Sequence, residues 1–367
     1  MKLGDICSKI GSGATPRGGK DSYKDSGTAI IRSQNVLDWS FSSIGLAFID
    51  DDQSKALSNV EVKQGDVLLN ITGDSVARAC MVPSEFLPAR VNQHVAIIRA
   101  NEEANNLFLL AWLQTNKGTL LKLASSGATR NALTKRMLEN LDVNLPPIDV
   151  QDKAAAFIDS IQAKIALNTK LNGYLEKLTS LLFDHYVDNC TTTTELCSFV
   201  NISSGKRPPI KSPNMTSECT IPLLGASGQM GYTNRYLTQD RLLVIGRVGT
   251  HGVVQRITEK AWPSDNTLIV RSPQYETTFQ LLRRIDYASL NRGSTQPLIT
   301  QRDLKACLVP QLDDTTLERF EREAGHLMDL HDHNAIESDR LAKLRDLLLP
   351  RLLSGDIDVS KVEGCTP

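Results

Sequence analysis

The fold is decided by the segment Gly127-Ala128-Thr129-Arg130-Asn131-Ala132-Leu133-Thr134, which returns 166 residues later as Gly293-Ser294-Thr295-Gln296-Pro297-Leu298-Ile299-Thr300. The same offset relates two leucine-rich segments, Leu175–Leu178 and Leu181–Leu182, to Leu341–Leu344 and Leu347–Leu348. Several matches in one order along the chain indicate an internal duplication.

Looser matches extend the duplication toward the start of the chain. Leu3–Pro16 resembles Leu196–Pro208, and Val91–Ile98 resembles Ser264–Val270. The offset falls from 192 to 174 and then to 166, so the first copy carries 26 extra residues. We therefore expect two domains with similar folds.

Each copy begins with short β-like runs between Gly, Pro and Asn turns and ends in a long helical pattern. The expected strands are Thr28–Arg32, Asp66–Ile71, Val95–Arg99, Arg241–Ile245, Val253–Ile257 and Thr267–Val270. The predicted architecture is α+β, with domains at residues 1–148 and 188–310, helices at 149–187 and 311–355, and a tail at 356–367.

Local signals suggest where the two long helices begin and end. Asp149 follows two prolines and is the expected N-cap of the first helix. Thr315 and Glu318 have the spacing of a capping box at the start of the second. Gly355 suits a left-handed C-cap, and Pro350 should kink the last turn or end the helix early.

Both helices show a seam that is apolar at its ends and polar in its middle. The first seam contains Ile158, Ile161, Ile165, Asn168, Asn172, Leu175 and Leu182. The second contains Ala324, Leu327, His331, Asn334, Ser338, Leu341 and Leu348. The chain order makes the helices antiparallel, so the polar centres can meet and fix the register of a pseudo-twofold molecule. At ~1.5 Å per residue, such helices span on the order of 57 Å.

Charge is distributed unevenly along a nearly neutral chain. The whole sequence has 41 Lys and Arg against 42 Asp and Glu. Residues 188–310 hold 14 basic against 9 acidic residues, a net of +5, and residues 311–367 hold 7 against 13, a net of −6. Because phosphate attraction is local, a neutral total permits a DNA-binding face.

No catalytic motif stands out. Gly246–Gly252 has neither a Walker lysine nor the GxGxxG spacing of a nucleotide site. The histidines at 326, 331 and 333 are spread around one helix, so we expect no metal site. Seven cysteines without a CxxC pair suit reduced thiols in the cytoplasm, and no run of residues is long and apolar enough for a membrane span.

Several segments resemble the specificity (S) subunit of type I restriction–modification systems. In the second half they are Pro222–Gly228, Gly231–Tyr236, Gly246–Gly249, Asp265–Leu268, Gly293–Thr300 and Leu344–Ile357. In the first half they are Gly65–Leu68 and Leu145–Pro147 with Gln151.

This resemblance implies a non-catalytic, DNA-reading subunit. Each β-rich domain would be a target recognition domain for one half of an asymmetric bipartite site in double-stranded DNA. The helices would set the unread spacer and bind two methyltransferase subunits, and motor-nuclease (restriction) subunits would join for cleavage. S-adenosylmethionine, ATP and Mg would bind to these partners, so the chain itself would hold no cofactor.

Base reading requires side chains with forked donors or paired donor and acceptor groups. The candidates in the first domain are Arg17, Lys20, Arg32, Gln34, Asn35, Arg78, Asn92 and Gln93. Those in the second are Lys206, Arg207, Lys211, Gln229, Tyr232, Arg235, Arg247, His251 and Arg292. Each of them also fits a solvated surface charge or a turn.

Two alternative functions remain open from the sequence. The chain could be an orphan relative that occupies methyltransferase subunits without directing cleavage. It could also be a scaffold whose β-rich domains bind a sugar or a peptide instead of DNA.

Overall fold

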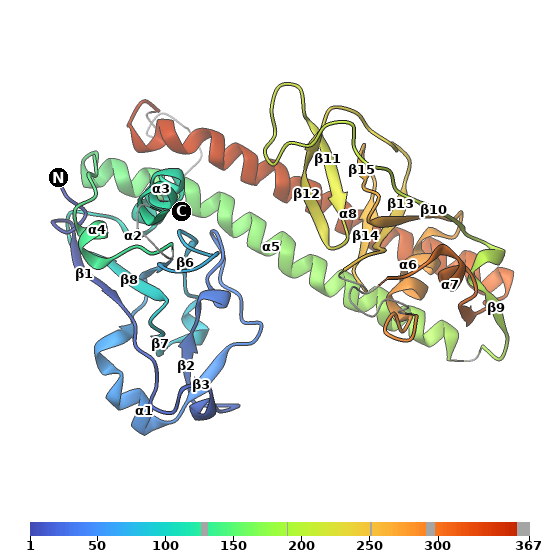
Figure 1. Cartoon of the computed structure of the whole chain (residues 1–367), viewed down its shortest axis with the longest axis horizontal. Coiled ribbons are helices and arrows are strands. Elements are labelled where there is room, and N and C mark those ends of the chain that lie inside the picture. Colours follow the sequence, from blue (N-terminus) through green and yellow to red (C-terminus); the bar gives the residue numbers. More distant parts are fainter. Residues whose placement is uncertain (126–130, 189, 250–251, 291–297, 358–367) are drawn as a thin grey trace. The chain divides into compact units, whose positions relative to one another are not determined.

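The computed structural model describes residues 1–125, 131–188, 190–249, 252–290 and 298–357. The chain divides into two compact units: residues 1–166 with the segment from 339 onward, and residues 167–338. Two long helices, α5 (Ile148–Val187) and α8 (Asp314–Leu353), each contribute residues to both units (Figure 1). The units thus divide within the helices, whereas the expected domains end where the helices begin.

The first unit contains two four-stranded sheets. One has the order β1-β8-β5-β6 with antiparallel neighbours, and the other has the order β3-β2-β7-β4 with a parallel β2–β7 pair. The strands are β1 (Cys7–Ser12), β2 (Thr28–Ile31), β3 (Ala47–Ile49), β4 (Glu61–Val62), β5 (Val67–Asn70), β6 (Ala79–Met81), β7 (Ala89–Val91) and β8 (Val95–Ala100).

Strand β5 is buried on both faces because a separate core lies on each side of it. Val67 and Leu69 pack into the core that also receives α2 (Asn106–Thr115), while Leu68 packs into the core of the second sheet. Successive side chains of a strand point to opposite faces. This explains why the strand is uniformly apolar instead of alternating with polar residues.

Short helices complete the first unit. They are α1 (Asp51–Ala56), α3 (Lys117–Ser125) and α4 (Lys135–Glu139). The Asn105 side chain caps α2 by accepting hydrogen bonds from the amides of Leu107 and Phe108 at 2.9 and 3.1 Å. Capping of this kind satisfies amides that have no partner inside the helix.

The second unit repeats the sheet β1-β8-β5-β6 as β10-β16-β13-β14, and we call this the main sheet of each unit. Its sheets have the orders β10-β16-β13-β14, β12-β11-β15 and β17-β9. The strands are β9 (Thr193–Glu195), β10 (Asn201–Ser204), β11 (Ile221–Gly225), β12 (Gly228–Thr233), β13 (Leu242–Gly246), β14 (Val254–Ile257), β15 (Trp262–Pro263), β16 (Thr267–Arg271) and β17 (Leu308–Pro310). Helices α6 (Tyr275–Arg284) and α7 (Gln301–Lys305) accompany them.

Strand register gives the correspondence between the two units. Asn70 pairs with Val95 in the first unit, and Gly246 pairs with Thr267 in the second. The offset at β8 and β16 is therefore 172, two residues less than the expected offset of 174. A two-residue shift keeps every side chain on the same face of the strand, so the correction changes which positions correspond but not which face they occupy.

Most of the extra length of the first copy lies before β7. Ile31 pairs with Val91 across 60 residues, whereas Leu224 pairs with Pro263 across 39. Helix α1 belongs to the longer connection. Connections on the surface tolerate such insertions because loop closure becomes only slowly more costly with length.

The starts of both long helices differ from the expected caps. The Pro147 carbonyl accepts the amides of Val150 and Gln151 at 3.0 and 3.1 Å, so α5 begins before Asp149. At α8, the Asp313 carboxylate accepts the amide and the hydroxyl of Thr316 at 3.0 and 2.6 Å. A carboxylate is a stronger acceptor than a hydroxyl, which explains why Asp313 and not Thr315 is the cap.

Pro350 does not end α8 early, because the helix continues to Leu353. An interior proline removes one hydrogen bond and costs ~3 kcal/mol. Leu349 and Leu352 are buried in the core of the first unit, and each buried leucine contributes ~1.5–3 kcal/mol, which offsets that cost. Gly355 then has φ of +77°, as the expected C-cap requires.

Candidate nucleic-acid interface

In each unit, an equivalent backbone hydrogen bond forms at one end of the main sheet. The amide of Gly13 donates to the Val95 carbonyl at 2.9 Å, and the amide of Gly205 donates to the Thr267 carbonyl at 3.0 Å. These equivalent bonds bring the segment after β1 or β10 against the start of β8 or β16.

Only glycine fits where these backbones cross. A Cβ atom on Gly13 would lie 1.9 Å from the Val91 carbonyl oxygen, and one on Gly205 would lie 2.1 Å from that of Ser264. Such distances are far below van der Waals contact. The two glycines therefore permit a close approach that holds the following loop residues in place.

A third segment joins each crossing from the neighbouring strand. The amide of Ile71 donates to the His94 carbonyl at 3.0 Å, and the amide of Arg247 donates to the Asn266 carbonyl at 2.8 Å. We call residues 13–15, 71–73 and 92–94 the first loop cluster. Residues 205–207, 247–249 and 264–266 form the second loop cluster.

The first loop cluster presents a chain of uncharged polar side chains. The Thr15 hydroxyl lies 2.5 Å from Gln93 Oε1, and Gln93 Nε2 lies 3.1 Å from Nε2 of His94. Nδ1 of His94 lies 2.6 Å from the Thr72 hydroxyl. The exposed Gln93 amide is thus oriented by Thr15 from another segment and by His94, which Thr72 holds in turn. The sequence pattern indicates Gln93 but not the residues that orient it.

The second loop cluster presents cations on the same backbone framework. Lys206 and Arg207 are exposed, and the Lys206 carbonyl accepts the indole N–H of Trp262 at 2.7 Å. Arg247 is half-buried, and Asn266 is exposed. By the equivalent hydrogen bonds, Arg207 corresponds to Thr15, and Asn266 corresponds to His94. Equivalent positions therefore carry different chemistry.

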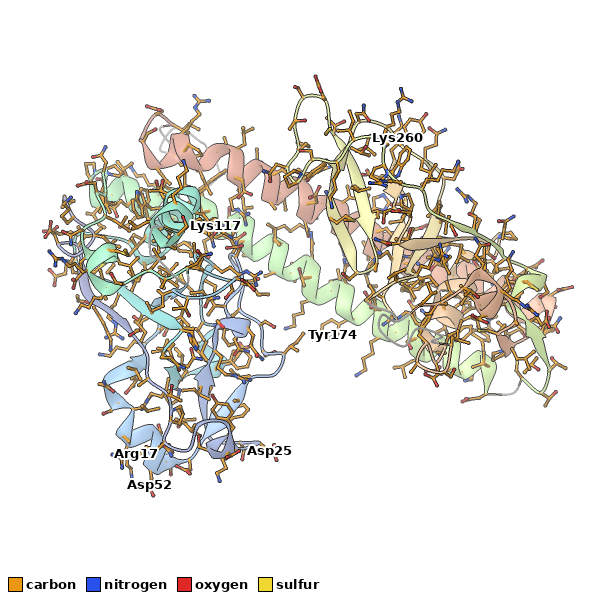
Figure 2. The ribbon with its side chains drawn as sticks, viewed as in Figure 1. Arg17, Asp25, Asp52, Lys117, Tyr174 and Lys260 are labelled. Atoms are coloured by element: carbon orange, nitrogen blue, oxygen red, sulfur yellow. The ribbon has the colours of Figure 1, made fainter. Side chains whose placement is uncertain are left out.

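Other candidates of the first unit lie outside its loop cluster. The backbone amide of Arg17 donates to Gln53 Oε1 at 3.2 Å, which places Arg17 beside α1, as Figure 2 shows. The Arg32 guanidinium lies 5.2 Å from the Tyr23 ring centre and donates to the Gly45 carbonyl.

Two candidate asparagines have structural roles. Asn35 is fully buried, and its amide donates to the carbonyls of Ser42 and Ile44 at 2.9 and 3.3 Å. Asn92 is buried, and its side chain accepts the amide of His94 at 3.1 Å. A base contact by either would require the local turn to open, so both are removed from the proposed interface.

The remaining candidates are dispersed. Gln34, Lys211, Gln229 and Arg235 are exposed, and Arg78 and Tyr232 are half-buried. Gln229 donates to the Gly231 carbonyl within its own hairpin at 3.2 Å. The side chain of Lys20, and residues His251 and Arg292, lie outside the described part of the structure.

The polar centre of the helix seam lies within the second unit. Nδ2 of Asn168 donates to the Asn334 carbonyl at 3.4 Å and to the Ser338 hydroxyl at 3.2 Å. Nδ2 of Asn334 donates to Oδ1 of Asn172 at 3.0 Å. The residue numbers rise along one helix as they fall along the other, so α5 and α8 are antiparallel here.

The apolar seam positions lie on either side of this centre. Ile158, Ile161, Leu175 and Ala324 are buried. Ile165, Leu182, Leu327, His331, Leu341 and Leu348 are half-buried. In the first unit, the Arg345 guanidinium reaches across from α8 to Gln162 Oε1 at 2.7 Å.

A second set of leucines on the long helices faces solvent. Leu178 and Leu181 of α5 are 51% and 57% exposed. Their repeat equivalents on α8, Leu344 and Leu347, are 45% and 73% exposed. Tyr174 of α5 also extends away from its helix into solvent (Figure 2). The same uncovered apolar pair thus occurs once in each unit.

Two features are absent from the described residues: a metal site of three or more side chains and a membrane-spanning helix. Among them, no group of three or more His, Cys, Asp or Glu side chains is arranged to hold a metal ion. No helix among them combines the length and apolar character that a membrane crossing requires.

Residues 1–177 match the family model described as type I restriction modification DNA specificity domain. The crystal structure of the type I restriction-modification system S subunit from M. genitalium matches with 13% identity and a TM-score of 0.59, covering 96% of this chain and 95% of that one. The HsdS subunit from Thermoanaerobacter tengcongensis matches with 16% identity and a TM-score of 0.38, covering 97% and 96%.

The M. genitalium match shows that the chain has the fold of a specificity subunit, with β-rich domains and long helices. Residues 1–177 carry the type I restriction modification DNA specificity domain.

Proposed function

We propose that each unit reads one half-site of a bipartite sequence in double-stranded DNA through its loop cluster. The main observation is that two equivalent backbone frameworks present different side chains. Because the two backbone frameworks are equivalent, both units would approach the duplex in the same way. Because their side chains differ, each unit would have its own base preference. Such a molecule reads an asymmetric site.

The chemistry of the exposed side chains supports this proposal. The forked amide of Gln93 matches the paired donor and acceptor of adenine in the major groove. The Arg207 guanidinium matches the two acceptors of guanine in the same way. Lys206 beside it suits a phosphate, which would position the unit without reading sequence.

Catalysis is assigned to partner subunits in this proposal. Two methyltransferase subunits would bind the chain and supply methyl transfer from S-adenosylmethionine. Motor-nuclease subunits would supply the steps that require ATP and Mg. The long helices would set the unread spacer between the two half-sites.

Methylation mapping tests the assignment of the loop clusters. The complex of this chain with its methyltransferase subunits is incubated with a DNA library, and the methylated sites are sequenced. Gln93→Ala should relax one position in one half-site, and Arg207→Ala should relax one position in the other. A lost bidentate contact is worth ~1–3 kcal/mol, or about 5- to 150-fold in discrimination.

Lys63→Ala is the control, because exposed Lys63 precedes β5 at the end opposite the loop cluster. It should leave the methylated motif unchanged. Unchanged motifs for both loop variants would count against the assignment. A parent complex that shows no bipartite motif would instead support the orphan or scaffold function.

A further inference from the structure

A buried guanidinium joins three elements of the second unit. Arg256 of β14 is 5% exposed, and its Nη1 lies 2.6 Å from Oε2 of Glu276 on α6. Its Nε and Nη2 donate to the two carboxylate oxygens of Asp332 on α8 at 3.0 and 2.9 Å. One side chain therefore ties a strand and a helix of the β-rich domain to a long helix.

Further charged contacts link α8 to the other long helix, α5, and link α5 back to α6. His331 lies between Asp332 at 3.1 Å and Glu176 of α5 at 3.2 Å. The second oxygen of Glu176 lies 3.1 Å from Nη1 of Arg283 on α6. We call Arg256, Glu276, Asp332, His331, Glu176 and Arg283 the charged clasp.

A second joint reinforces the same contact between α6 and α8. The Glu321 carboxylate of α8 accepts the amides of Glu276 and Thr277 at 3.2 and 2.7 Å. These amides lie in the first turn of α6, where an anion is favoured by the helix dipole. α6 is thus fixed to α8 at its N-terminal turn, and Arg283 fixes its last turn to α5.

Buried ion pairs are weak evidence for stability but good evidence for a specified geometry. Removing two charges from water is costly, and apolar residues of similar volume often stabilise a protein as well. Directional bonds, however, permit one register, whereas an apolar surface tolerates sliding. Arg256 also lies 4.9 Å from the ring centres of both Tyr275 and Phe279, which restricts its position further.

The first half of the chain carries different residues at the equivalent helix positions. At the offset of 166, Asp332 corresponds to Ala166 and His331 corresponds to Ile165. Neither side chain carries a charge. The clasp is therefore specific to the second unit, and it is not a general requirement of the duplicated fold.

We propose that the charged clasp positions the second recognition domain on the helix pair, so that it determines which spacer length between the half-sites is accepted. The inference rests on the proposed function, because a spacer matters only to a protein that reads two half-sites. The clasp residues act through the position of the domain and are positioning residues. Weakening the clasp should broaden the spacer and leave base preference intact.

The experiment uses the assembled complex with methyltransferase subunits. DNA substrates carry the two parent half-sites separated by the parent spacer or by one base pair more or less. Asp332→Asn and Glu176→Gln should each lower the preference for the parent spacer about tenfold, with the half-site bases unchanged. Asp339→Asn, which removes a solvent-exposed pair with Lys343 on the same helix, is the control.

The half-exposed Arg283 gives a second route if Asp332→Asn does not fold. Arg283→Gln should broaden the spacer, and Arg283→Lys should restore the parent preference. Folded variants with an unchanged spacer would overturn the inference, as would loss of base preference in the second half-site. Failure of the proposed function would differ, since the parent complex would then methylate without regard to two spaced half-sites.

Discussion

Glycine at the strand crossing is the residue on which each loop cluster depends. Gly13 and Gly205 occupy equivalent positions, where a Cβ atom would lie only 1.9 and 2.1 Å from a backbone carbonyl oxygen. Backbone atoms cannot move aside as a flexible side chain can. An added methyl group therefore has to displace the crossing itself.

Gly205→Ala should destabilise the second unit by about 3 kcal/mol or more, because the new Cβ overlaps the Ser264 carbonyl. Hydrogen exchange followed by mass spectrometry checks this unit by unit. Peptides from residues 196–312 should exchange faster, and peptides from residues 1–145 should keep the parent rate.

Gly11→Ala is the matched control in the first unit. No atom lies within 4 Å of a Cβ at Gly11, and this glycine lies in the paired strand β1. The Gly11→Ala variant should show the same amide hydrogen exchange as the parent protein. Equal acceleration by Gly11→Ala and Gly205→Ala would show that strand propensity, and not the crossing, is responsible.

The candidate site was only partly predictable from single residues. Gln93 and Arg207 could be named because forked side chains beside turns are typical of base readers. The orientation of Gln93 could not, because Thr15, Thr72 and His94 are far apart in sequence and meet only through strand register. For the same reason, the sequence could not show that Asn35 is buried.

At the scale of elements, the strands and both long helices could be predicted from apolar patterns and turn residues. Their ends were less certain, because Asp313 and Thr315 are both good caps and only the structure decides between them. The clasp was beyond prediction, because Arg256 and Asp332 are 76 residues apart and carry no local signal.

His331 makes the contact between α8 and α5 dependent on pH. Burial alone would lower its pKa, but hydrogen bonds to Asp332 and Glu176 outweigh burial and raise the pKa of His331 to about 9. Arg256 and Arg283, on β14 and α6, pair with the same two carboxylates. Despite burial, bonds to His331 and Arg256 lower the pKa of Asp332 to about 2, so it stays charged at neutral pH.

Protonated His331 stabilises the folded state, so its contribution should be complete below about pH 6.5 and lost as the pH rises through 9. The loss is at most roughly 3 kcal/mol. Thermal unfolding of the parent and of His331→Gln at intervals from pH 6 to 10 measures it. The Tm difference between the two proteins should shrink with rising pH, and a constant difference would contradict this account.

At the scale of the whole molecule, duplication extends to surfaces as well as to folds. Leu178 and Leu181 have the same spacing, the same helix position and a similar exposure as Leu344 and Leu347. Singly exposed apolar side chains are ordinary, but an adjacent pair that recurs at equivalent positions suits a surface that a partner covers. One such pair in each unit favours two copies of one partner over a single copy or two unlike ones.

Each leucine pair can be changed separately, so the number of methyltransferase subunits bound to the chain should fall in steps. Leu178→Asp with Leu181→Asp should lower the complex from two methyltransferase subunits to one, because covering a carboxylate with an apolar partner surface removes its hydration. Leu344→Asp with Leu347→Asp should do the same, and the four changes together should abolish assembly. Native mass spectrometry or light scattering counts the subunits.

Since all four side chains face solvent in the free chain, hydrogen exchange of the variants alone should match the parent. Retention of both subunits by the fourfold variant would place the partner on another surface, whereas loss of both subunits in each double variant would show that the two sites bind cooperatively and not independently.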